Sequence, residues 1–292
     1  PPPPHLNDPP TPEISTVYKS SAASDVYKRQ LLHSAAMLPE RLHIPDVETS
    51  DDADSTREAA IVLVAGAILL LLFNYWGRPG FYNSSGLIDW MADTVGGPLA
   101  EDPGVGGYLW WGISSLLFRV FLPLVVIVFV LRRPPVEFGF RLRGIAAHLP
   151  IYVTMYLVML PVLIWVSSFE SFRTFYPFYD RAGEGGAAFW LYELGYVVQF
   201  IGVEAFFRGF LTFGLLRRFG LLSIVVMTVP YTMIHFSKPM PEATAAIVAG
   251  LVLGYLAVRS RSFVPGVILH VSVALTMDLL VLGRAGALTD IF

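Results

Sequence analysis

The chain has 292 residues, of which 54% are hydrophobic and only 15% are charged. Soluble domains carry about 25% charged residues, so this composition excludes an ordinary soluble protein. The net charge of -3 gives no reason to expect nucleic-acid binding. The sequence has no cysteine, which excludes a thiol nucleophile, disulfide bonds and thiolate metal sites.

The N-terminal segment, residues 1–58, is rich in Pro, Ser and Asp, and this composition predicts disorder. Within it, the stretch Asp25–Gln30 reads as the translation of a transposon end used in sequencing libraries. We therefore expect residues 1–36 to be an assembly artefact and Met37 to be the true start. The segment takes no part in the predicted fold.

Seven apolar runs follow, and each is a candidate for a transmembrane helix, since about 20 residues cross the hydrocarbon core. Their approximate bounds are Ala59–Trp76, Tyr108–Leu131, Leu149–Phe169, Ala188–Leu216, Leu221–His235, Ala243–Val258 and Phe263–Leu282. The sequence therefore predicts an all-α, polytopic transmembrane helix bundle of about seven spans, with N-terminal helices at 59–131 and a second domain at 136–283. A further short helix within residues 81–95 is expected at the membrane interface.

Arginines cluster in alternate loops, after the second, fourth and sixth runs. They are Arg132, Arg133, Arg141, Arg143, Arg217, Arg218, Arg259 and Arg261. The positive-inside rule makes these loops cytoplasmic. We therefore expect an integral protein of a bacterial plasma membrane, with a cytoplasmic N-terminus and a C-terminus outside.

Polar side chains interrupt the later runs, where a charge costs about 2.5–3.5 kcal/mol on insertion scales. Glu204 and Arg208 are spaced i,i+4, so they share one helix face. A self-compensating ion pair is one interpretation. The functional interpretation is that Arg208 holds Glu204 ionised beside a reaction centre.

Two histidines and an aspartate join this pair. His235 ends the fifth run, while His270 and Asp278 lie about two turns apart on the seventh. Counting about 1.5 Å per residue from the loops predicts Glu204, His235 and Asp278 at one depth. The same count places Arg208 and His270 nearer the cytoplasm.

A carboxylate and an imidazole that share a water can act as general base and acid in peptide-bond hydrolysis. The predicted pair is Glu204 and His235, with His270 as donor to the oxyanion. Glu204, His235 and His270 also match a zinc set, but no H-E-x-x-H motif is present. A water-activating pair without a cofactor is the first interpretation, and zinc is the second.

These residues resemble the motifs of the CAAX protease and bacteriocin-processing (CPBP) family of intramembrane endopeptidases, also called the Abi family. That family shows Glu-Glu-x-x-x-Arg, then Phe-x-x-x-His, then His-x-x-x-Asn or Asp, each on a membrane helix. The corresponding stretches of this chain are Val203-Glu204-x-x-x-Arg208, Tyr231-x-x-x-His235 and His270-x-x-x-Ala274. The similarity covers about residues 136–282.

The resemblance implies a hydrolase whose catalytic residues are Glu204, His235 and His270. Its supporting residues would be Arg208, Tyr231 and Asp278. The implied substrate is a peptide or a membrane-anchored protein, cut in CAAX-type or bacteriocin-related processing.

Two positions depart from the family pattern. Val203 stands where the family has its usual water-activating Glu, and Ala274 stands where it has the last Asn or Asp. Either Glu204 has become the base, with Asp278 as the replacement partner, or the chain has lost proteolysis. Glu193 lies about 16 Å before Glu204 along the helix and is too distant to substitute.

Three functions therefore remain open. The first is an intramembrane endopeptidase, and the second is an impaired pseudoprotease that binds or regulates a membrane partner. The third is a small proton-coupled transporter, although no inverted repeat is visible between the two halves. The expected partners are the lipid bilayer and a peptide or membrane-protein substrate, without nucleic acid.

Overall fold

The computed structural model describes residues 47–291, and this part of the chain is helical without a strand. Residues 1–46, which include the proposed artefact, lie outside the described residues. The helices are α2 (Ala53–Trp76), α3 (Pro79–Ser84), α4 (Leu87–Val95), α5 (Pro98–Glu101), η2 (Pro103–Val105), α6 (Gly106–Leu116), η3 (Leu117–Phe121), α7 (Leu122–Val125), η4 (Val126–Val130), η5 (Pro135–Phe138), η6 (Ile145–Ala147), α8 (Leu149–Val166), α9 (Glu170–Arg173), η7 (Ala182–Glu184), α10 (Gly186–Glu204), η8 (Ala205–Leu211), α11 (Thr212–Phe219), α12 (Leu222–Met233), α13 (Met240–Ser260), α14 (Val264–Ala285) and α15 (Leu288–Ile291). The predicted all-α class is confirmed.

Within the described range, six helices are long and apolar enough to cross a membrane. Two of them run through several segments: Pro103–Val130, with 28 residues, and Gly186–Phe219, with 34 residues. The predicted span Leu221–His235 is too short to cross. Only Leu222–Met233, 12 residues, is helical there, which gives about 18 Å against a hydrocarbon core of about 30 Å.

Helix α2 begins at Ala53, earlier than the predicted start at Ala59. The cause is an N-cap, since a carboxylate oxygen of Asp52 accepts a hydrogen bond from the Ser55 backbone N–H at 2.6 Å. That hydrogen bond lowers the pKa of Asp52 to about 2. Residues 53–58, predicted as disordered, are therefore helical.

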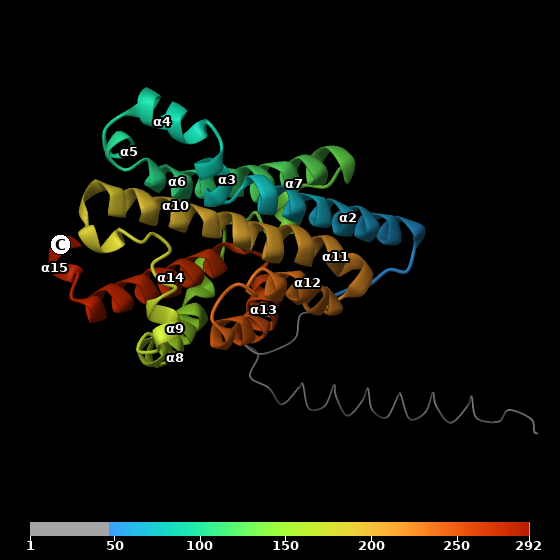
Figure 1. Ribbon diagram of the computed structural model, residues 1–292. Helices are drawn as coiled ribbons and strands as arrows, with labels where there is room; N and C mark the ends of the chain where they lie inside the picture. The colour runs from blue at the N-terminus through green and yellow to red at the C-terminus, as the bar shows by residue number, and fades with distance from the viewer. Residues whose placement is uncertain (1–46, 292) are drawn as a thin grey trace, which may run out of the picture. The chain divides into compact units, whose positions relative to one another are not determined.

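The long helix from Gly186 to Phe219 lies between the other spans (Figure 1). α6 and α14 pack against α10, whereas α2 and α12 pack against α11. Of the spanning segment, 78% is buried inside the protein, compared with 17–39% for the other five. Protein rather than lipid therefore surrounds this helix, which is why it can carry polar side chains.

Helices α6 and α10 approach each other closely at two glycines of α10. A Cβ at Gly195 would lie 2.2 Å from the backbone carbonyl oxygen of Tyr108. A Cβ at Gly202 would lie 2.2 Å from the Ser115 hydroxyl, which itself donates to the carbonyl of Gln199 at 3.0 Å. Small residues allow such contacts between membrane helices.

Candidate active site

Glu204 and Arg208 form a buried ion pair at the junction of α10 and η8. Both residues have 0% of their surface exposed, and Arg208 Nη1 lies 3.0 Å from Glu204 Oε1. The i,i+4 pairing predicted from the sequence is confirmed. η8 (Ala205–Leu211) has π-helical turns, a rare geometry that is frequent at functional sites.

His270 on α14 contacts the same carboxylate oxygen, with its Nδ1 2.9 Å from Glu204 Oε1. Because a carboxylate accepts, Nδ1 carries the proton, and the neutral ring keeps an unprotonated Nε2. Gly266 makes room for the contact, since a Cβ there would lie 2.7 Å from Glu204 Oε2. The Phe200 ring, with its centroid 4.3 Å from that of His270, holds the imidazole from another side.

His235 lies in the loop that follows α12. Its Nδ1 is 2.8 Å from the carbonyl oxygen of Tyr231, so this nitrogen also donates and leaves Nε2 free. The Tyr231 ring contacts the His235 ring, with 4.7 Å between centroids. Arg208 also contacts that ring, with its Cζ 3.8 Å from the centroid. Tyr231 thus links His235 to the buried ion pair.

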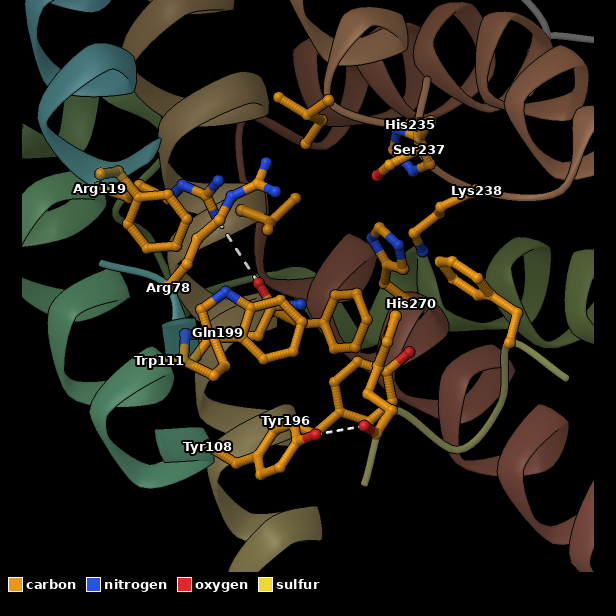
Figure 2. A pocket seen from close by; sticks show the side chains of 17 residues that line it. Arg78, Tyr108, Trp111, Arg119, Tyr196, Gln199, His235, Ser237, Lys238 and His270 are labelled. Atoms are coloured by element: carbon orange, nitrogen blue, oxygen red, sulfur yellow. Dashed lines mark hydrogen bonds between the residues drawn. The ribbon is translucent and has the colours of Figure 1, made fainter. Parts of the chain in front are cut away.

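Both imidazoles line one cavity of about 260 Å³ (Figure 2). Val203 lines this cavity too, whereas Glu204 does not. Since each histidine uses Nδ1 in a hydrogen bond within the protein, Nε2 is the nitrogen left for a bound molecule. The arrangement offers two proton-transferring groups to one site.

Residues 185–276 match the family model described as "Type II CAAX prenyl endopeptidase Rce1-like". For this segment, the match confirms the resemblance to CAAX proteases that the motifs indicated. The six apolar helices of the described chain are those of an integral membrane protein, and the matched segment is similar to a family of membrane proteases. No curated protein and no solved structure matches the chain.

The matched segment contains both histidines and the ion pair, but Asp278 lies beyond it. Asp278 accepts a hydrogen bond from the Tyr192 hydroxyl at 2.6 Å and does not line the cavity. The shared depth of Glu204, His235 and Asp278 stays a prediction, and the histidine that contacts Glu204 is His270.

Lys238, Glu242 and Tyr176 form a polar cluster beside the histidines, and the three motifs do not include it. Lys238 Nζ lies 2.6 Å from Glu242 Oε1, and Tyr176 donates to the same carboxylate at 2.7 Å. Burial holds the pKa of Tyr176 well above its usual value, so the phenol stays a neutral donor. The i,i+4 spacing of Lys238 and Glu242 was a visible signal. Tyr176 gave none, because it lies 62 residues from Lys238 in the sequence.

The zinc set predicted as an alternative does not fit this arrangement. Glu204 Oε1 already contacts Arg208 and His270, so the guanidinium occupies the position that a zinc ion would need. Among residues 47–291, no three His, Asp or Glu side chains are grouped to hold a metal ion. His235 points to the same cavity as His270 but does not converge on Glu204.

Proposed function

We propose that this chain is an intramembrane endopeptidase that hydrolyses a peptide bond in a peptide or a membrane-anchored protein. The observation that carries the proposal is that His235 and His270 line one cavity inside a bundle of membrane helices. The match to a CAAX-type endopeptidase family covers both histidines and supports the same chemistry. CAAX-type and bacteriocin-related processing are the two substrate classes within this proposal.

His270 is the group that activates water in this mechanism. The Glu204 carboxylate holds the Nδ1 proton, so Nε2 accepts a proton as water attacks the scissile carbonyl carbon. The imidazolium that results is stabilised by the carboxylate, and Arg208 keeps that carboxylate ionised. His270 then returns the proton to the leaving nitrogen. Glu204 acts through His270 as a positioning residue, not as the base predicted from the sequence.

His235 is the donor to the oxyanion. Its Nδ1 stays bonded to the Tyr231 carbonyl, so Nε2 donates to the oxygen that gains negative charge only in the imidazolium, whose second proton comes from solvent. Burial and the neighbouring Lys238 lower the pKa of His235 to about 4, so this donor is present at acid pH. The neighbouring Lys238 also lines the cavity, where Glu242 pairs with its ammonium group. The roles of the two histidines are therefore the reverse of those predicted from the sequence.

An impaired pseudoprotease is the second candidate, and Val203 is the observation that favours it. This valine lines the cavity at the place where the family pattern has its water-activating Glu. A valine cannot take a proton, so in this candidate the cavity binds a peptide without cutting it.

The test is cleavage of a peptide library by the protein purified in detergent, followed by mass spectrometry. The variants are His270→Ala and His235→Ala, with His148→Ala as a matched control at the start of α8, outside the cavity. We expect wild type and the control to cut, and the His270 variant to lose at least about 100-fold in rate. Cleavage that survives both cavity substitutions would remove the assignment.

The same preparation distinguishes the alternatives. If wild type does not cut but Val203→Glu does, the chain is an impaired protease whose missing base has been restored. If neither cuts and wild type in liposomes takes up a solute with protons, the transporter is supported instead.

A further inference from the structure

The cavity has a second polar end, away from the two histidines. Arg78, Arg119 and Gln199 line it (Figure 2). Arg78 follows α2, Arg119 belongs to the π-helical η3, and Gln199 belongs to α10. Three segments thus bring two guanidinium groups and an amide to one place.

Arg119 is buried without a compensating charge. Only 5% of its surface is exposed, yet its Nε has no hydrogen-bond partner. Its Nη1 donates to Gln199 Oε1 at 3.4 Å, and its Cζ lies 3.5 Å from the centroid of the Phe73 ring. Within residues 47–291, no carboxylate lies within 4.0 Å of Arg119 or of Arg78.

The other buried arginine makes the contrast plain. Arg208 has Glu204 as its partner at 3.0 Å, as expected of a charge inside a membrane protein. Arg119 is also buried but lines a cavity. A buried cation that lines a cavity and has no compensating carboxylate indicates an anionic ligand.

We propose that Arg78, Arg119 and Gln199 form a subsite that binds a carboxylate of the substrate. A guanidinium fork matches the two oxygens of a carboxylate. Gln199 Oε1 accepts from Arg119, so its side-chain NH2 remains as a further donor. The inference rests on the proposed function, because it names a group on the peptide that the histidines cut. The carboxylate is either the C-terminus of that peptide or an Asp or Glu side chain.

The subsite draws on a part of the chain that the family match does not cover. Arg78 and Arg119 precede residue 185, and only Gln199 lies within the matched segment. A peptide anchored here and cut at the histidines lies across the cavity. The bond that is cut therefore stands at a fixed number of residues from the carboxylate.

The test compares peptides that differ only in charge. One pair has a free or an amidated C-terminus, and a second pair has an internal Asp or Asn. We expect wild type to cut one carboxylate peptide with a kcat/KM at least about tenfold above its neutral partner. The pair that shows the preference identifies the source of the carboxylate.

Substitutions of the two arginines test whether the preference for the carboxylate peptide depends on them. Arg119→Gln should abolish it and Arg78→Gln should reduce it, because each variant loses kcat/KM for the carboxylate peptide relative to the neutral peptide. Arg173→Gln, an exposed arginine outside the cavity, is the control and should keep it. If Arg119→Gln does not give a folded protein, the carboxylate preference is measured with Arg78→Gln instead, because Arg78 is exposed.

Two results would overturn the subsite. One is equal cleavage of both members of both pairs by wild type. The other is stabilisation of wild type but not of Arg119→Gln by vesicles rich in an anionic lipid, without any peptide preference. If wild type cuts no peptide, the proposed function fails separately. The same peptides, each carrying a fluorescent label, then measure the carboxylate preference through binding alone, by fluorescence anisotropy.

Discussion

Glu204 holds its partners through a single oxygen. Oε1 lies 3.0 Å from Arg208 Nη1 and 2.9 Å from His270 Nδ1, whereas Oε2 has no hydrogen-bond partner in the described chain. One partner is a permanent cation, and the other becomes a cation only when its ring takes a second proton. Arg208 therefore determines whether this carboxylate is tolerated in the core, while His270 connects it to the cavity.

Removal of the arginine should therefore be more harmful than removal of the whole pair. Arg208→Met leaves a buried carboxylate without its cation, and we expect the free energy of unfolding to fall by about 3–5 kcal/mol. The double variant Arg208→Met/Glu204→Gln has no stranded charge, so it should be more stable than Arg208→Met alone. Unfolding in detergent measures all of these variants.

Arg173→Met, at an exposed position, is the control and should stay within about 0.5 kcal/mol of wild type. The single variant Glu204→Gln completes the cycle. A double variant whose loss of stability equals the sum of the losses of Arg208→Met and Glu204→Gln would show that the charges are not coupled.

The local part of this site could be predicted from the sequence, and the long-range part could not. Glu204 and Arg208 are four residues apart, and helix geometry alone brings them together. The contact between Glu204 and His270 joins positions 66 residues apart. It depends on how α14 is rotated and where Gly266 lets it approach, and neither follows from hydropathy.

At the scale of elements, hydropathy located the helices better than it located their ends. α8 starts at the predicted Leu149, but α2 starts at Ala53, because the Asp52 cap adds a turn that is not apolar. The expected interfacial helix within residues 81–95 is divided into α3 and α4. The π-helical turns in η3 and η8 have no side-chain pattern that would reveal them, yet they carry Arg119 and Arg208.

Close packing of α6 and α10 gives a prediction at this scale. Gly195→Ala places a Cβ 2.2 Å from the carbonyl oxygen of Tyr108, and backbone cannot move aside as a side chain can. We expect the two helices to separate and the free energy of unfolding to fall by about 1–3 kcal/mol. Gly80→Ala in α3 meets nothing within 4 Å and should cause no loss. Equal stability of both variants, measured by thermal unfolding in detergent, would contradict the packing.

At the scale of the whole described chain, ion pairs join loops that the alternating spans place on the same side. Arg217, after η8, pairs with Asp52 at the start of α2, with 2.8 Å between Nη2 and Oδ2. Arg181, before α10, pairs with Asp102, with 2.8 Å between Nη1 and Oδ2. These two contacts agree with the predicted grouping of the loops that precede the fifth apolar run. Which group faces the cytoplasm is a separate prediction, made from the positive-inside rule.

The absence of cysteine makes this orientation directly measurable, because a single introduced thiol is the only target for a maleimide. Ala146 lies in the loop before α8 and Thr174 in the loop after it, and both are exposed. In intact bacteria, an impermeant maleimide should label Thr174→Cys but not Ala146→Cys, and lysis should make both react. The unaltered chain is the control and should stay unlabelled. The opposite pattern would reverse the orientation, and equal labelling before lysis would show that α8 does not cross the membrane.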